Sequence, residues 1–185
     1  MTGAIVIAVL FALGLIPLFV FRTEPVVRAL EIVTPKERLS WRMAVAVLTV
    51  HMTLCCVLIA TTGHLAPPRT LAGAFVFLGG MTFWLWGRRA IGPLRDRRTP
   101  DQPPRAFRDD GPFGLVRNPL NFGLVLACAG LAVTAGHFSV WLTFIGCVYV
   151  LDLRARHEEE RMRAQLGASY EAYQRAVKRL IPFVW

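Results

Sequence analysis

The fold is decided by residues 118–151, which read NPLNFGLVLACAGLAVTAGHFSVWLTFIGCVYVL without one charged side chain. A helix that crosses a bilayer needs about 20 mostly apolar residues, so this stretch is far too long for a single crossing. Its small residues at 134–137, Thr-Ala-Gly-His, offer a flexible place for the chain to turn back. We therefore predict a hairpin of two membrane helices, whose second arm, 138–151, is short and tilts or packs against its neighbours.

Three further uncharged stretches, 3–21, 43–68 and 70–87, are each long enough for one crossing. The first follows no basic segment, so we expect a retained helix rather than a signal peptide. Pro35 follows a threonine and is expected to open the second helix. These patterns predict an all-α fold, a polytopic membrane helical bundle with about five transmembrane helices and a C-terminal cytoplasmic helix.

The positive charges fall almost entirely on one side of this predicted bundle. With five crossings, all but one of the 21 lysines and arginines lie in linkers 22–42 and 88–117 or in the tail that follows residue 151; the exception is Arg69. The positive-inside rule then puts the N-terminus outside and the C-terminus in the cytoplasm, as in a bacterial inner membrane. The same bias accounts for the net charge of +9, so we expect no nucleic-acid binding.

The chain divides into two predicted parts. Residues 1–87 form three N-terminal transmembrane helices with a basic cytoplasmic linker. Residues 88–185 form a second region with an irregular, proline-rich cytoplasmic loop at 88–117, the helical hairpin 118–151 and C-terminal cytoplasmic helices that break at Gly167. The four cysteines lie in predicted helices without ligand spacing, so we predict neither a metal site nor a disulfide.

Two segments of the second region carry motifs. The first reads GPF at 111–113 and RNPLNFG at 117–123; the second reads EE at 158–159, then Gly167, Tyr170 and Tyr173, then LIPF at 180–183. In this order and spacing they resemble the isoprenylcysteine carboxyl methyltransferase and phospholipid methyltransferase superfamily of integral membrane enzymes. The resemblance covers about the last 100 residues.

The chain departs from the family motif at two positions. Asn118 stands where the motif has histidine, and Asn121 stands where it has tyrosine. Asparagine at the first position also occurs in phosphatidylethanolamine methyltransferases, which tilts the expected acceptor toward a phospholipid amine. The resemblance itself leaves a carboxylate, an amine and a thiol open as acceptors.

The resemblance implies methyl transfer from the cofactor S-adenosylmethionine to a lipid or small hydrophobic acceptor at the cytoplasmic membrane interface. The expected partners are the lipid bilayer and this lipophilic acceptor. The positions that it implies for catalysis are Arg117, Asn118, Arg154 and Glu159. The positions that it implies for cofactor binding are Gly111, Phe113, Val116, Arg117, Asn118, Pro119, Asn121, Glu158, Glu159, Tyr170 and Tyr173.

Other interpretations remain open from the sequence. Residues 117–122 also resemble the motif of nicotinamide-dependent membrane reductases, and the altered motif allows a catalytically inactive accessory protein of the same fold. The glutamates at 158–160 could instead form a solvated helix face, because Arg154 with Glu158 and Glu159 with Arg163 are four residues apart.

Overall fold

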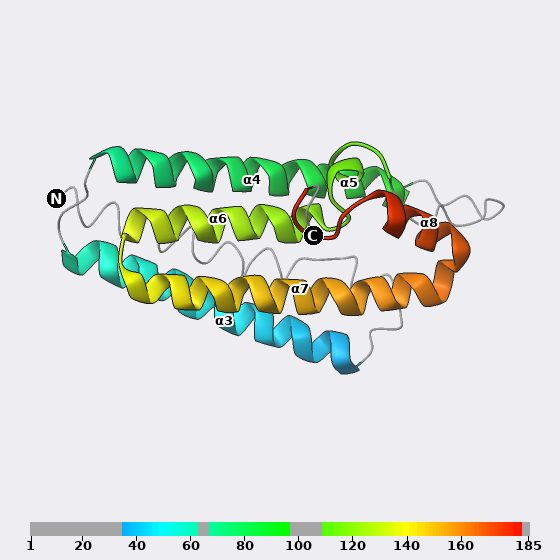
Figure 1. Ribbon diagram of the computed structural model, residues 1–185, viewed down its shortest axis with the longest axis horizontal. Helices are drawn as coiled ribbons and strands as arrows, with labels where there is room; N and C mark the ends of the chain where they lie inside the picture. Colours follow the sequence, from blue (N-terminus) through cyan, green and yellow to red (C-terminus); the bar gives the residue numbers. More distant parts are fainter. Residues whose placement is uncertain (1–34, 63–66, 97–108, 183–185) are drawn as a thin grey trace.

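The computed structural model describes residues 35–62, 67–96 and 109–182. Its helices are α3 (Pro35–Thr62), α4 (Pro67–Asp96), α5 (Pro112–Leu115), α6 (Pro119–Ala135), α7 (Phe138–Leu166) and α8 (Ala168–Ala176). The four long helices lie side by side, with α3 and α6 running in one direction and α4 and α7 in the other (Figure 1). The predicted first helix, 3–21, lies outside the described residues.

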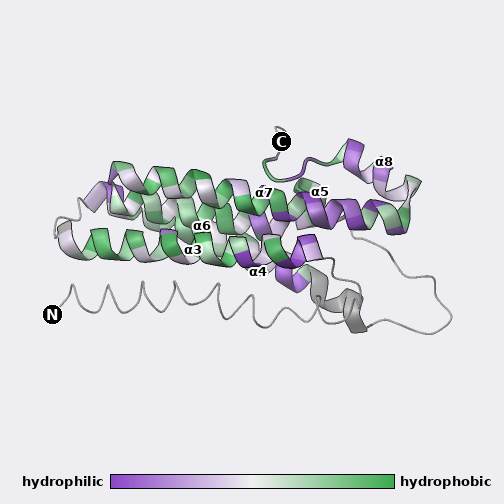
Figure 2. Cartoon of the chain, turned by 90° about the horizontal axis from the view of Figure 1, so that it is seen from below, coloured by the Kyte–Doolittle hydropathy of each residue, from purple (hydrophilic) through white to green (hydrophobic). Residues whose placement is uncertain are grey.

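The long helices have the length and composition of membrane spans. Three of them, α3, α4 and α7, are long and apolar enough to cross a bilayer, and α6 is a shorter apolar helix. Hydrophobic residues follow the four helices, while hydrophilic ones gather toward the end that carries α5 and α8 (Figure 2). The predicted all-α membrane bundle is therefore confirmed.

The predicted hairpin is also confirmed, although its second arm is not short. The α6 helix ends at Ala135, and Gly136 reverses the chain with φ 60°, a left-handed conformation that glycine adopts at little cost. From Phe138 the α7 helix continues without a break to Leu166, so it leaves the apolar region as one straight element. Glycine at 167 then separates it from α8, as predicted.

One boundary was predicted wrongly. We expected an irregular loop from residue 88, but α4 continues to Asp96 and includes Pro93. A proline removes one backbone hydrogen bond from a helix. Near the end of α4 this loss is small compared with the backbone hydrogen bonds that the rest of the helix keeps. The charged residues at 88–96 therefore extend a membrane helix rather than begin a loop.

The α4 and α6 helices meet through glycine. A Cβ atom added to Gly80 would lie 2.5 Å from the backbone nitrogen of Ala127, and one added to Gly130 would lie 2.4 Å from that of Phe77. Small residues allow such close backbone approach, which is how helices associate in lipid. Of the two glycines at 79 and 80, only Gly80 lies in this contact, since a Cβ on Gly79 would meet nothing within 4 Å.

A buried histidine joins α3 to the hairpin. The ring nitrogens of His51 lie 2.8 Å from the Thr143 hydroxyl oxygen on α7 and 3.1 Å from the Cys128 carbonyl oxygen on α6. His51 is completely buried. Both of its ring nitrogens thus serve helix packing.

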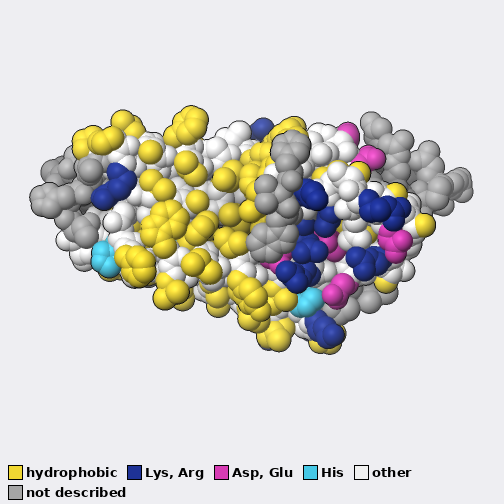
Figure 3. All heavy atoms as spheres, viewed as in Figure 1, with side chains coloured by type: hydrophobic (Ala, Val, Ile, Leu, Met, Phe, Trp, Pro, Cys, Tyr) yellow, Lys and Arg dark blue, Asp and Glu magenta, His cyan; other side chains and the backbone are white. Residues whose placement is uncertain are grey.

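Charged side chains mark one end of the bundle. On the face shown in Figure 3, lysine, arginine and carboxylate side chains gather around α5 and α8, whereas the surface over the long helices is hydrophobic. Arg69 lies at the opposite end, because a Cβ on Gly136 would come within 2.3 Å of its guanidinium group. We call the charged end, formed by α5, α8 and the adjoining ends of α6 and α7, the polar end.

Candidate active site at the polar end

The two motif segments lie against each other at the polar end. The Arg117 backbone N–H donates to the Lys178 carbonyl at 2.8 Å, and the Asn118 N–H donates to the Arg179 carbonyl at 3.1 Å. These two bonds hold residues 177–182, here called the C-terminal segment, alongside the start of α6. Leu180 completes the contact, because its side chain is fully buried in the core with Trp84 and Leu151.

A buried carboxylate lies at the centre of this contact. Glu159, on α7, is 3% exposed and accepts from Arg117 Nε at 2.8 Å and from Arg117 Nη2 at 3.1 Å. It also accepts from Asn118 Nδ2 at 3.2 Å, Gln174 Nε2 at 3.3 Å and Arg179 Nε at 2.9 Å. A carboxylate offers about four lone-pair sites, so protein donors alone saturate Glu159.

The solvated-face interpretation is therefore wrong for Glu159. Its partners are Arg117 and Arg179, distant in sequence, rather than Arg163, four residues later on α7. Arg163 instead donates to the Gln174 side-chain oxygen at 3.0 Å. Glu158 is half-buried, and Glu160 is the exposed member of the acidic run.

A second carboxylate extends the network. Asp152 lies seven residues before Glu159, on the same face of α7, and accepts from Arg179 Nη1 at 3.2 Å and from Arg156 Nε at 2.6 Å. Burial disfavours the charge of Arg179, but its hydrogen bonds and charge attraction to Glu159 and Asp152 together raise its pKa. The network thus holds Arg179, in the C-terminal segment, to two positions on α7.

The two asparagines at the altered motif positions have different partners. Asn118 begins α6, and its side chain donates to Glu159 rather than capping the helix. Asn121 is buried, donates to the Leu151 carbonyl at 3.4 Å and accepts from Arg154 Nη1 at 3.2 Å. Asn121 therefore links α6 to α7 and orients the guanidinium group of Arg154.

The two motif tyrosines form an aromatic pair behind the carboxylates. The ring centroids of Tyr170 and Tyr173 are 5.9 Å apart, and both side chains are buried. The Tyr173 hydroxyl donates to the Phe113 carbonyl at 2.7 Å, which connects α8 to α5. Burial, followed by the charges of Glu159 and Glu158, raises the pKa of Tyr170; burial and then Tyr170 raise the pKa of Tyr173.

The remaining sequence-predicted positions surround this cluster. Val116 and Pro119 are buried and shape the entry into α6, and Phe113 is half-buried. Gly111 is exposed and has φ 57°, a conformation in which a larger residue would be strained. These positions define the chain path around Arg117 rather than supplying further charged groups.

Sequence reasoning missed three members of the network: Asp152, Gln174 and Arg179. The seven-residue spacing to Glu159 could have indicated Asp152, because that spacing places two side chains on one face of a helix. Arg179 directly precedes the LIPF motif, which was a weaker signal. No local pattern indicates Gln174, whose position depends on how α8 folds back.

The cluster has the groups needed to hold a charged, partly aromatic small molecule. Arginines suit a carboxylate, a half-buried glutamate suits an ammonium group or hydroxyls, and buried tyrosine rings suit an aromatic base or a cation. Among the described residues no group of three or more metal-ligating side chains is found.

One comparison with curated proteins finds a relative. The chain is 37% identical over 79 residues to "Methanethiol S-methyltransferase 2" of Bradyrhizobium diazoefficiens (strain JCM 10833 / BCRC 13528 / IAM 13628 / NBRC 14792 / USDA 110). The match covers 42% of this chain and 29% of that protein, so it spans less than a third of the relative's length. No protein-family model and no solved structure matches the chain. The partial similarity supports, at most, a place among membrane methyltransferases.

Proposed function

We propose that the chain is an S-adenosylmethionine-dependent methyltransferase that acts on a lipid or small hydrophobic acceptor at the membrane interface. The observation that carries the proposal is the contact of Arg117 with Glu159, which brings the motif regions 111–123 and 158–182 to one end of an apolar bundle. The partial similarity to a protein named as a methyltransferase supports the same reaction class. We expect the reaction to take place on the cytoplasmic side of the membrane.

In this proposal the network positions the site, and its neighbours contact the cofactor. Glu159 is saturated by protein donors, so it fixes Arg117 and the C-terminal segment. Arg154 and Glu158, both half-buried, are our candidates for the cofactor's carboxylate and its ammonium or hydroxyl groups. Tyr170 and Tyr173 would lie near its sulfonium or adenine, where a cation–π contact contributes about 0.5–2 kcal/mol.

The chemistry asks little of the protein beyond alignment. When bound, S-adenosylmethionine would supply an activated methyl group to a lone pair of the acceptor and would leave as S-adenosylhomocysteine. Holding the two reactants in line lowers the barrier by up to about 7–11 kcal/mol. The rigid network around Glu159 provides the fixed frame that this alignment needs, and the apolar helices next to it give access from the bilayer.

Two glutamates of the acidic run, Glu158 and Glu160, provide the test. We expect Glu158→Gln to weaken S-adenosylhomocysteine binding by about tenfold or more, since one charged contact is worth roughly 1.5–3 kcal/mol, while the melting temperature stays unchanged. The matched control is Glu160→Gln, which removes the same charge from an exposed position. Isothermal titration of the purified variants measures their affinities for S-adenosylhomocysteine, and thermal melts measure their melting temperatures. Equal affinity in the two variants would remove Glu158 from the proposed site.

A further inference from the structure

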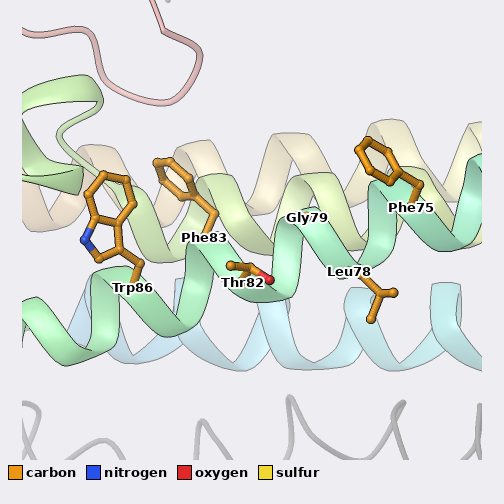
Figure 4. A pocket seen from close by; sticks show the side chains of 6 residues that line it. All are labelled: Phe75, Leu78, Gly79, Thr82, Phe83 and Trp86. Atoms are coloured by element: carbon orange, nitrogen blue, oxygen red, sulfur yellow. The ribbon is translucent and has the colours of Figure 1, made fainter.

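The aromatic side of the proposed cofactor site is closed in this structure. Tyr170 is 5% exposed and Tyr173 is 7% exposed. The groove of about 500 Å³ on α4 (Figure 4) is lined by residues of that helix alone, from Phe75 to Trp86, and includes neither tyrosine. A cofactor that stacks on these rings must therefore displace part of the protein before it binds. Both rings are carried by α8, so movement of this one helix would uncover them.

The α8 helix has little stability of its own. It has nine residues, and isolated helices shorter than about 12–15 residues are marginal in water. Tyr170 and Tyr173 are its buried residues, and most of the others are exposed. Among the described helices its backbone approaches only α7. The order of α8 therefore depends on two aromatic rings and on its hydrogen bonds to neighbouring elements.

The hydrogen bonds that hold α8 in place come from several directions. The Tyr173 hydroxyl donates to the Phe113 carbonyl on α5 at 2.7 Å. The Gln174 side chain donates to Glu159 at 3.3 Å, and the Gln174 carbonyl accepts from Arg117 Nη1 at 2.8 Å. Each such bond makes only a modest net contribution, because water replaces it when the helix leaves. Few contacts of α8 thus oppose its opening.

A glycine hinge joins α8 to α7. Gly167 has φ 56° and ψ −134°, a combination that glycine adopts far more readily than other residues. Its N–H donates to the Arg163 carbonyl in α7 at 2.9 Å, whereas its carbonyl accepts from the Tyr170 N–H in α8 at 3.1 Å. Rotation about the φ and ψ bonds of Gly167 breaks neither of these hydrogen bonds. The bond from Ser169 Oγ to the Leu166 carbonyl crosses the hinge at an exposed position, where water can replace it.

The chain that follows α8 stays anchored. Leu180 is fully buried in the core, and the carbonyls of Lys178 and Arg179 accept backbone hydrogen bonds from the chain that enters α6. With Gly167 fixed at one end and Lys178 at the other, α8 can leave α7 by local unfolding but not as a rigid body. Local unfolding is expected where apolar contacts are few and the backbone hydrogen bonds are exposed to solvent.

We propose that α8 is a lid, which unfolds locally to admit S-adenosylmethionine from the aqueous side and refolds over the bound cofactor. The inference rests on the proposed function and adds to it the step that limits cofactor entry and release. Refolding of α8 returns Tyr170 and Tyr173 to the site, so the aromatic wall is complete only when the cofactor is enclosed. The rate of α8 opening, rather than diffusion, then limits how fast the cofactor binds.

The test measures the opening of α8 and the binding of the cofactor separately. Tyr173→Phe removes the hydrogen bond from α8 to α5 and keeps the aromatic ring. Tyr149→Phe makes the same chemical change at an exposed position on α7 and is the matched control. Full-length wild type and both variants, purified in detergent, are compared by amide hydrogen exchange without ligand and by stopped-flow association of S-adenosylhomocysteine.

We expect the α8 amides of wild type to exchange faster than those in the middle of α7. Tyr173→Phe should speed α8 exchange by about fivefold, which corresponds to the loss of one neutral hydrogen bond, and Tyr149→Phe should leave it unchanged. The association rate of wild type should level off as the S-adenosylhomocysteine concentration rises, because opening then limits binding. The level at which it saturates should be higher in Tyr173→Phe.

Two results would overturn the lid. One is exchange of α8 as slow as that of central α7. The other is an association rate that rises in proportion to S-adenosylhomocysteine concentration and is equal in wild type and Tyr173→Phe. A folded wild type that binds no S-adenosylhomocysteine would instead refute the proposed function, while fast exchange of α8 would still show that the helix opens.

Discussion

Along the α4–α6 contact two helices meet through glycine, whereas at the polar end α6, α7 and the C-terminal segment meet through arginines and carboxylates. Gly80 and Gly130 allow backbone atoms to touch, and the atoms nearest to these two glycines are backbone or apolar side-chain atoms. At the polar end Glu159 alone accepts hydrogen bonds from four side chains. In lipid the hydrophobic effect does not drive apolar helices together, so close packing holds them. Buried charged groups instead need partners of opposite charge.

The difference also separates scaffold from site. Glycine contacts fix how far apart α4 and α6 lie but specify no chemistry. Burying the arginine and carboxylate side chains has a desolvation cost, which only good pairing geometry offsets. The network holds Arg117 within hydrogen-bond distance of Glu159.

The largest effect is expected from disrupting the glycine contact between α4 and α6. Gly80→Leu should leave little folded protein, because its Cβ would overlap the Ala127 backbone, which cannot move without separating the helices. Overpacking usually costs about 1–3 kcal/mol, and a clash of backbone with backbone costs more. The adjacent Gly79→Leu serves as the control and should melt at or above the wild-type temperature. Similar melting curves for the two variants would contradict the packing described here.

The next largest effect is expected from breaking the ion pair between Arg117 and Glu159 at the polar end. Glu159→Ala should lower the free energy of unfolding by about 3–5 kcal/mol, because it leaves Arg117 buried without its carboxylate. Glu160→Ala, at an exposed position, should change it by less than about 0.5 kcal/mol. Denaturant unfolding in detergent compares the two. If Glu159→Ala cost only a few tenths of a kcal/mol, the carboxylate would belong to a solvated helix face after all.

The smallest effect is expected from removing the hydrogen bond that connects α8 to α5. Tyr173→Phe removes the hydroxyl that donates to Phe113 and should cost about 1 kcal/mol. Because the pKa of Tyr173 is raised in the folded protein, its contribution is complete below the unfolded value of about 10 and is lost as the pH rises above it. Stability measured from pH 8 upward, in steps, should therefore fall less steeply in Tyr173→Phe. Tyr149→Phe, at an exposed position on α7, should follow the wild-type profile.

Much of the bundle could be predicted from the sequence because apolar length is a local property. The uncharged stretch 118–151 exceeds one bilayer crossing, which forces the turn that the structure places at Gly136. The start of α3 at Pro35 follows from the same kind of local signal. The end of α4 could not be predicted in this way, because charge and Pro93 indicate a loop when the tertiary setting is unknown.

The candidate site was predictable only in part. The motif resemblance indicated Arg117, Asn118 and Glu159, which the structure places in mutual contact. It could not show that Glu159 is saturated, because the donors Gln174 and Arg179 reach it only when the C-terminal segment folds back onto α6. Contacts between residues so far apart in sequence leave no periodic trace. Their roles in catalysis stay predictions.

The most direct test of the central claim is titration of the purified wild-type protein with S-adenosylhomocysteine, with NADPH titrated in parallel. The account predicts saturable binding of S-adenosylhomocysteine at one site per chain, a raised melting temperature on binding, and no effect of NADPH. Saturable binding and thermal protection by NADPH alone, or no binding of S-adenosylhomocysteine by a folded protein, would contradict it.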